Sequence, residues 1–240
     1  MATGSGAGPA PDGAATAPFD AATAARIAAA FRPRAWYGNR TAWFYTRAKL
    51  RTDPLYPGVV EALRGCDAPL LDLGCGLGLL AHALRDAGLG MAYRGVDIDA
   101  RKIAQAARAA ANAGLRDVAF EATDLSARMP AHRGSVAILD VLQFVPPGAQ
   151  ASILDAAIAM LEPGARLVIR TGLDDGSARA RTTRGIDVLS RALRWMNAGP
   201  QSYPDPGALR ARFDSAGLSA RFAPLYGRTP FNNWLVVAGR

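Results

Sequence analysis

Residues 69–80 constrain the fold more than any other part of this 240-residue chain. They read Pro-Leu-Leu-Asp-Leu-Gly-Cys-Gly-Leu-Gly-Leu-Leu, an apolar run that reaches Asp72 and then passes through three alternating glycines. An apolar run of this length is typical of a strand buried on both faces of a parallel sheet. Gly74, Gly76 and Gly78 allow a tight turn and a close approach of the backbone to a ligand. In doubly wound folds, such a turn at the carboxyl end of a strand binds nucleotide-like cofactors.

The same turn departs from the dinucleotide fingerprint Gly-x-Gly-x-x-Gly. Gly74 and Gly76 match it, but Leu79 stands where the third glycine is required, which leaves an NAD-linked oxidoreductase as a weaker alternative. The pattern resembles instead motif I of the class I S-adenosylmethionine (SAM) methyltransferases, Asp-x-Gly-x-Gly-x-Gly. The resemblance implies that Asp72 lies near the methionine end of SAM, and that the glycines, with Cys75 between them, wrap that end.

A second strand-like segment also ends in an acid. Residues 93–97 read Tyr-Arg-Gly-Val-Asp, and an acid about twenty residues past the glycines accepts hydrogen bonds from ribose hydroxyls in βαβ nucleotide-binding units. By the same resemblance, Asp97 binds the ribose and Ile98 packs against the adenine. Asp99 is expected to cap a helix over residues 101–113, because aspartate accepts from the free N–H groups of a first turn.

Further segments continue the resemblance in the order of the family. Residues 118–123 form an expected third strand that ends at Asp124 and Leu125, which the family places near the adenine. Residues 161–170 resemble the family's helix end, Pro-Gly turn and fifth strand. The matching segments cover residues 68–172 and imply a Rossmann-like class I methyltransferase fold.

The fourth expected strand, residues 135–139, leads to the position that lies beside the transferable methyl group in this family. Asp140 is there the best-placed acid for orienting the cofactor or accepting a proton, and it is our candidate catalytic residue. Gln143, Phe144 and Arg170 also follow carboxyl ends of strands. We expect them to line the acceptor pocket, with Arg170 pairing with an anionic substrate.

The residues after this strand limit the class of acceptor. Enzymes that methylate amino groups of DNA bases or glutamine often carry (Asp/Asn)-Pro-Pro-Tyr here, whereas residues 140–143 read Asp-Val-Leu-Gln, closer to small-molecule methyltransferases. Residues 49–56 and 227–233 look similar to methyltransferases of bacterial aryl-polyene pigment clusters. That resemblance implies an aromatic or polyketide-like acceptor, either free or bound to a carrier protein.

Residues 26–66 are expected to form a helical region that covers the cofactor. Aromatic residues gather there and are followed by cations. We expect Tyr45, Arg47 or Lys49 to close over SAM or the substrate, with a cation pairing with the cofactor carboxylate. The alternative is that the aromatic side chains only pack against the domain.

Alternating strands and helices predict one α/β domain, residues 26–240, with a mostly parallel sheet of seven strands. The last two expected strands, residues 220–226 and 233–238, fit the antiparallel hairpin that ends the methyltransferase sheet. An insertion at about 173–204 is expected to contact the substrate. Residues 1–25 are rich in Ala, Gly, Pro and Thr and are expected to form a disordered tail.

Charge and composition narrow the range of partners. The net charge is +8, without a dense basic run. A basic balance suits an anionic partner, but neither a separate RNA-binding module nor an RNA-recognition signature is visible. An RNA methyltransferase and a non-catalytic SAM-binding protein therefore remain as alternatives to a small-molecule enzyme.

The sequence predicts no metal site and no membrane span. Two cysteines, Cys66 and Cys75, give neither a disulfide framework nor metal-ligand spacing. With His82 and His132 as the histidines available, a zinc site is not expected. No apolar run is long enough to cross a bilayer, and unpaired cysteines suit the reducing cytoplasm.

Overall fold

The apolar run before the glycines forms an interior strand of a mixed sheet. A computed structural model describes residues 16–33, 35, 37–174, 202–227 and 232–240. Within these residues the strands are β1 Leu70–Leu73, β2 Tyr93–Asp97, β3 Val118–Ala122, β4 Ser135–Leu139, β5 Arg166–Gly172, β6 Ser219–Pro224 and β7 Asn233–Gly239. Their order across the sheet is β3-β2-β1-β4-β5-β7-β6. The first five strands are parallel, and β7 runs antiparallel to both β5 and β6.

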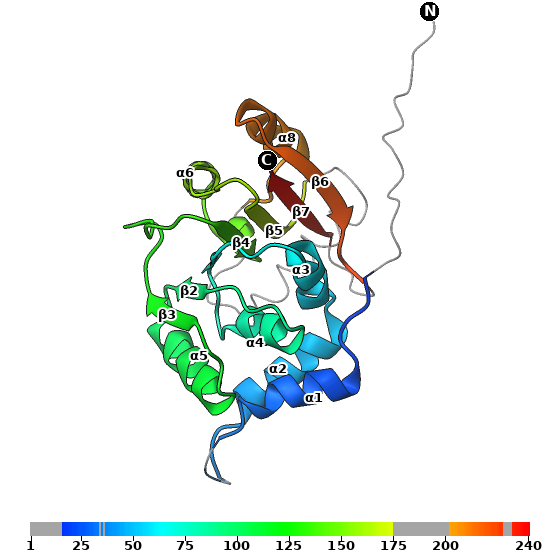
Figure 1. Cartoon of the computed structure of the whole chain (residues 1–240), viewed down its shortest axis with the longest axis vertical. Helices are drawn as coiled ribbons and strands as arrows, with labels where there is room; N and C mark the ends of the chain where they lie inside the picture. The colour runs from blue at the N-terminus through cyan, green and yellow to red at the C-terminus, as the bar shows by residue number, and fades with distance from the viewer. Residues whose placement is uncertain (1–15, 34, 36, 175–201, 228–231) are drawn as a thin grey trace, which may run out of the picture.

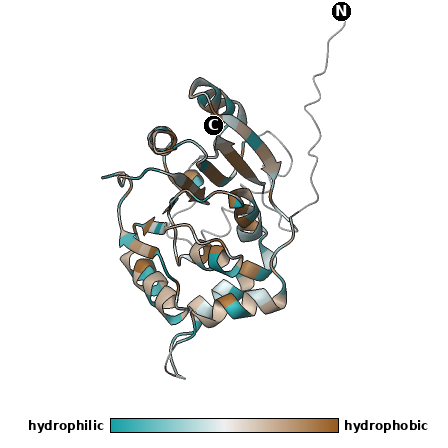
Figure 2. Ribbon diagram, viewed as in Figure 1, coloured by the Kyte–Doolittle hydropathy of each residue, from teal (hydrophilic) through white to brown (hydrophobic). Residues whose placement is uncertain are grey.

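Both faces of the sheet are buried, which explains the continuous apolar character of its strands. Alternate side chains of β1 enter different cores: Leu71 and Leu73 join one hydrophobic cluster, and Leu70 joins another. This is the two-residue period of a strand. Figure 2 shows β5 and β7 among the most hydrophobic parts of the molecule.

Helices cover the two faces. They are α1 Ala21–Ala29, α2 Thr41–Thr52, α3 Leu55–Leu63, α4 Leu79–Asp86, α5 Ala100–Asn112, the short 3-10 helix η1 Leu142–Phe144, α6 Pro147–Ala159 and α8 Pro206–Ser215. Apolar residues of α6 and α8 pack on the Leu71 face, and those of α3 and α4 pack on the Leu70 face. Figure 1 shows these two helical layers on either side of the strands, with α1 and α2 beyond α4.

The predicted fold class is confirmed: the sheet is Rossmann-like, mostly parallel and closed by an antiparallel hairpin. The predicted cap of α5 is also confirmed, because Asp99 accepts from the backbone N–H groups of Arg101 and Lys102. Helix α1 begins at Ala21, inside the stretch assigned to the tail. Residues 1–15 of that tail, and most of the expected insertion at 173–204, lie outside the described residues.

Candidate cofactor and acceptor site

The glycine turn joins β1 to α4 at the carboxyl edge of the sheet. The backbone N–H groups of Gly74 and Cys75 donate to the carbonyl oxygen of Val96, at 2.8 and 2.9 Å, which fastens the turn to β2. All three glycines have positive φ angles, between 56° and 78°. Side-chain-bearing residues rarely adopt this conformation, so the turn geometry itself accounts for glycine at these positions.

The three glycines differ in what surrounds them. A Cβ atom on Gly74 would lie 2.3 Å from the Val141 side chain, and one on Gly78 would lie 2.5 Å from the Phe120 ring. A Cβ on Gly76 would meet nothing within 4 Å. Protein packing therefore already requires glycine at the first and third positions, whereas the middle one faces open space where a ligand can approach the backbone.

Asp72 lies buried beneath this turn with one free acceptor atom. Its Oδ2 accepts from the Tyr93 hydroxyl at 2.6 Å, while its Oδ1 is buried without a hydrogen-bond partner. Burial raises the pKa of Asp72 to about 7; the Tyr93 hydrogen bond opposes that rise and the nearby charge of Asp97 adds to it. A buried polar atom without a partner is unfavourable, so Oδ1 is a natural position for a ligand donor.

Asp97 ends β2 beside the same turn, as the sequence predicted. Its two carboxylate oxygens accept from the backbone N–H groups of Gly76 and Asp99, each at 2.9 Å. A carboxylate has about four acceptor positions, so capacity remains for further donors. The next residue, Ile98, exposes 71% of its surface, and a flat apolar ring packed on it would bury that area.

Asp124 and Leu125 reach the neighbouring part of this edge. The Thr123 N–H donates to the Asp97 carbonyl oxygen and aligns the ends of β2 and β3. The Asp124 carboxylate accepts from the N–H and hydroxyl of Ser126, which lowers its pKa. Leu125 packs against the core. The positions agree with the predicted adenine side, and their contact with a cofactor stays a prediction.

Asp140 belongs to a network of two acids and two cations, of which Arg170 and Asp53 are buried and Lys49 and Asp140 are partly exposed. Arg170 contacts both carboxylate oxygens of Asp140 through one guanidinium nitrogen and both oxygens of Asp53 through another, the latter at 3.1 and 3.2 Å. Lys49 donates to Asp53 at 2.7 Å and to Asp140 at 3.4 Å. The formal charges of the four side chains cancel, as buried ions require.

This network bears on the predicted roles of Arg170 and Asp140. Arg170 is only 3% exposed and already binds two carboxylates, so it is not available as a free partner for an anionic substrate. Burial opposes the ionisation of Asp140, but Arg170 and Lys49 outweigh it and hold its pKa below the ordinary value. A carboxylate held ionised in this way is a poor proton acceptor, so the structure favours an orienting role for Asp140.

The remaining substrate candidates divide into internal and accessible side chains. Gln143 is buried, and its side-chain oxygen accepts from the Thr171 hydroxyl at 3.1 Å. Phe144 is partly exposed, and Tyr45 on α2 is 42% exposed, one turn before Lys49. Tyr45 and Phe144 are therefore better placed for contact with an acceptor than Gln143, which supports the loop from inside.

Sequence reasoning missed Tyr56, Tyr93 and Asp53. Tyr56 packs where three apolar clusters meet, and burial, followed by the charges of Tyr45 and Asp72, raises its pKa well above the ordinary value. The available signal for Asp53 was its position four residues after Lys49 on a helix. The available signal for Tyr93 was Gly95, two residues later on the same face of β2. Because glycine has no side chain, it leaves room for the tyrosine to extend along the sheet.

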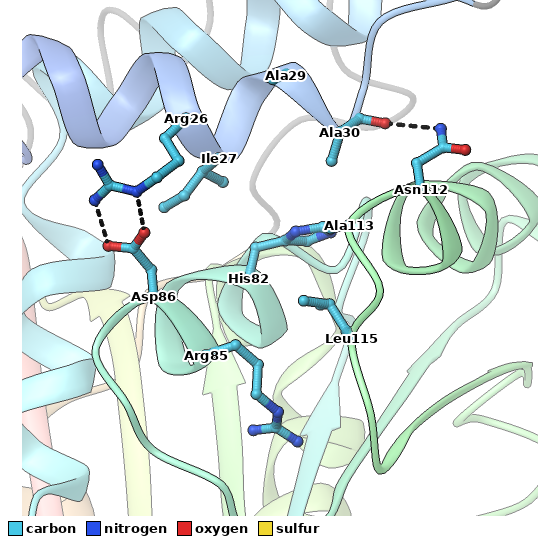
Figure 3. Close-up of a pocket in the computed structure, with 10 residues that line it drawn as sticks. All are labelled: Arg26, Ile27, Ala29, Ala30, His82, Arg85, Asp86, Asn112, Ala113 and Leu115. Atoms are coloured by element: carbon cyan, nitrogen blue, oxygen red, sulfur yellow. Dashed lines mark hydrogen bonds and ion pairs between the residues drawn. The ribbon is translucent and has the colours of Figure 1, made fainter.

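A cavity of about 700 Å³ lies between α1 and the carboxyl ends of α4 and α5 (Figure 3). Its charged groups are engaged with the protein itself: Arg26 binds Asp86, and Arg85 donates to several backbone carbonyls. His82 is buried there, and burial lowers its pKa to about 4, so it is neutral at pH 7. This cavity lies toward the far end of α4 from the glycine turn and is not our candidate active site.

The described residues offer neither a metal-binding cluster nor a membrane-spanning helix. No group of three His, Cys, Asp or Glu side chains in them is arranged to hold a metal ion. In the same residues, no helix combines the length and the apolar character that a membrane crossing demands.

Known sequences similar to this chain are methyltransferases. Residues 66–183 match a family model described as a methyltransferase domain. The ubiquinone biosynthesis O-methyltransferase of Xylella fastidiosa is 33% identical over 156 residues, which are 63% of this chain and 61% of that protein. The enzyme of the same name from Brucella anthropi is 29% identical over 177 residues, 71% of this chain and 66% of that protein. The chain thus spans roughly 61–66% of these relatives.

Solved structures with the same fold are more distant in sequence. Magnesium protoporphyrin IX methyltransferase from Synechocystis PCC 6803, solved with bound S-adenosylhomocysteine (SAH), has a TM-score of 0.62 at 18% identity and covers 90% of this chain and 92% of that one. Mitomycin 7-O-methyltransferase has a TM-score of 0.61 at 20% identity and covers 82% and 56%. Identities this low speak for the fold alone.

Proposed function

Because the chain belongs to the class I SAM-dependent methyltransferases, we propose that it transfers the methyl group of SAM to a small-molecule acceptor. When bound, SAM would supply a methyl group activated by its sulfonium: the acceptor atom would bond to the methyl carbon as the carbon–sulfur bond breaks, SAH would be the leaving group, and the proton of a hydroxyl acceptor would pass to solvent. The observation that carries the proposal is the meeting of Asp72, Gly76 and Asp97 at one sheet edge.

The residues at this edge fit the parts of SAM. The partnerless Oδ1 of Asp72 suits the ammonium group, and the open space over Gly76 admits a ligand against the backbone. The spare acceptor positions of Asp97 suit ribose hydroxyls. Exposed Ile98 suits the adenine ring. Each of these four features is unexplained by packing within the described residues and is accounted for by one adenosyl amino acid.

The network around Arg170 positions the next segment of the site. It fixes Asp140, whose φ of +60° is a left-handed conformation that aspartate seldom adopts. Val141 then packs over Gly74 at the cofactor turn. A rigid link between the turn and the loop that follows β4 favours alignment of acceptor and methyl group, and such positioning contributes on the order of 7–11 kcal/mol in well-oriented reactions.

We infer that the acceptor atom is an oxygen of an aromatic or polyketide-like compound. The sequence Asp-Val-Leu-Gln at 140–143 is of the small-molecule type, and the ubiquinone biosynthesis enzymes reported above are named as O-methyltransferases. Partly exposed Phe144 and Tyr45 provide aromatic surface near the network. A carrier-bound form of the acceptor is part of this proposal.

Cofactor binding is tested first, by titration calorimetry of the full chain with SAM, SAH and NAD. We expect saturable binding of SAM and SAH and none of NAD. Binding of NAD alone would overturn the cofactor assignment.

Acceptor class is tested with SAM carrying a radiolabelled methyl group. Phenols, catechols, aromatic acids, carrier-bound aromatic thioesters and total RNA are compared, and products are separated by chromatography before and after mild base, which releases methyl esters. We expect label on small aromatic acceptors. Transfer confined to RNA would replace the proposal with the nucleic-acid alternative, and SAM binding without transfer to any acceptor would favour a non-catalytic protein.

A further inference from the structure

The hydroxyl of Tyr93 reaches Asp72 across the backbone of a glycine. Asp72 on β1 is the register partner of Gly95 on β2, and Tyr93 lies two residues earlier on the same face of β2. A Cβ atom on Gly95 would lie 3.0 Å from the Tyr93 hydroxyl and 2.8 Å from the Cys75 sulfur. The absent side chain therefore opens the path along which the tyrosine contacts the carboxylate at 2.6 Å.

That contact makes the two carboxylate oxygens of Asp72 differ in their hydrogen bonding. One oxygen is occupied by the tyrosine, and the other is buried without a partner. The tyrosine ring is itself held by the core, with the Phe120 ring centred 5.8 Å away. The free oxygen is therefore presented in a fixed direction by a rigid support.

We propose that Tyr93 is a positioning residue that ties up Oδ2 of Asp72 and leaves Oδ1 for the cofactor ammonium, so that cofactor binding ionises Asp72 and releases a proton. This inference rests on the proposed function and extends it to a linkage between pH and cofactor affinity. In the step, the carboxylic acid O–H bond breaks, the proton passes to buffer, and the carboxylate pairs with an ammonium that keeps its own protons.

The surroundings of Asp72 agree with this linkage. Burial raises its pKa to about 7, the Tyr93 hydrogen bond lowers it and the charge of Asp97 raises it. The charge of Asp72 also acts on Cys75 in the turn and on Tyr56 on α3, and it contributes to raising the pKa values of both. Neither of these side chains can carry a positive charge that would favour the ionised form of Asp72. An α-ammonium has an ordinary pKa of about 8, so it arrives charged at pH 7 and favours the ionised acid.

The native protein is tested by calorimetry with two probes. SAH carries the amino acid part, and 5′-methylthioadenosine shares the adenosine and sulfur but lacks the ammonium and carboxylate. Titrations at pH 7 in buffers of different ionisation enthalpy give the number of protons released. We expect SAH to release about half a proton, as a pKa of about 7 requires, and methylthioadenosine to release none.

The variant Tyr93→Phe keeps the ring and removes only the hydroxyl. Without its hydrogen bond, Asp72 holds its proton to higher pH. Relative to the native protein at the same pH, SAH affinity should therefore fall about three- to tenfold at pH 7, and this difference should disappear by pH 9, while methylthioadenosine affinity stays within twofold. Asp72→Asn should lose both the proton release and the pH dependence. Equal loss at every pH, or equal loss for both probes, would mean that Tyr93 is merely structural.

The native titration keeps the test independent of how the variants fold. Binding of both probes without net proton release overturns the linkage and leaves the proposed function standing. Binding of neither SAH nor methylthioadenosine overturns the proposed function itself. The two failures are thus distinguishable in one set of measurements.

Discussion

The glycine turn illustrates how a single residue's role depends on the space beside it. Gly74, Gly76 and Gly78 share a backbone conformation, but only Gly76 has open space where a side chain would point. Cofactor recognition and packing therefore impose different requirements on neighbouring positions of one motif. A variant at Gly76 can separate them, provided that it tolerates a positive φ angle.

We expect Gly76→Asn to abolish SAH binding while leaving the fold intact. Asparagine adopts the left-handed conformation more readily than most residues, and its side chain would occupy the space proposed for the cofactor. Gly88→Asn is the matched control, since Gly88 also has a positive φ and open surroundings but lies beyond the other end of α4. Calorimetry and thermal unfolding of both variants decide. Unchanged SAH affinity in Gly76→Asn would contradict the proposal that the cofactor occupies the space over Gly76.

Asp72 should reduce the stability of the unliganded protein at neutral and higher pH. Its native pKa, about 7, exceeds the ordinary value of 3.8, so the native state holds a proton that the unfolded chain loses first. The free energy of unfolding therefore falls as pH rises from about 4 to about 7 and then levels off.

Asp72→Asn removes this penalty, and we expect it to raise the free energy of unfolding by about 1–4 kcal/mol at pH 8, because one pKa unit is worth about 1.4 kcal/mol. At pH 4 the two proteins should have nearly equal stability. Urea denaturation at both pH values measures the difference. A variant less stable than the native protein at pH 8 would show that Asp72 is not under strain there.

At the scale of elements, local sequence patterns predicted the positions of strands, which neighbouring residues determine. The strands that begin at 93, 118 and 135 start where the apolar runs predicted them. Local patterns could not predict ion pairs between distant residues. Asp53 and Arg170 are 117 positions apart and meet only when α2 and α3 dock on β5. For this reason the sequence pattern indicated a substrate ligand at Arg170. In the structure, Arg170 on β5 binds Asp53, which follows α2, and Asp140, which follows β4.

Replacing Arg170 should destabilise the protein strongly. Arg170→Met leaves buried Asp53 and partly buried Asp140 with Lys49 as a cationic partner, and removing one member of a buried ion pair costs about 3–5 kcal/mol. Arg94→Met is the control, because the Arg94 and Glu121 side chains of that pair are 35% and 39% exposed, and solvent-exposed pairs contribute little. Chemical denaturation compares the two variants. Equal losses would indicate that the network adds nothing beyond a surface pair.

At the scale of the whole molecule, the candidate site is assembled from distant parts of the chain. The N-terminal helices are fastened to the domain by the Arg26–Asp86 ion pair and by the Asn112 side chain, which donates to the Ala30 carbonyl. The backbone of Phe19 also donates to Leu50 on α2. Lys49 lies on α2 and binds both Asp53, the residue after that helix, and Asp140 at the sheet edge. The N-terminal helices and the sheet therefore form one structure around the site (Figure 1).

A ligand that binds such a site should stabilise the entire fold in one transition. At a concentration of one hundred times its dissociation constant, SAH adds about 2.7 kcal/mol to the free energy of unfolding. For a chain of this size that is a rise in Tm of about 5–11 °C. Differential scanning calorimetry should show a single peak that moves upward with SAH and not with NAD. If SAH instead split the transition and left an early peak for the N-terminal helices in place, the cap would be energetically separate from the site.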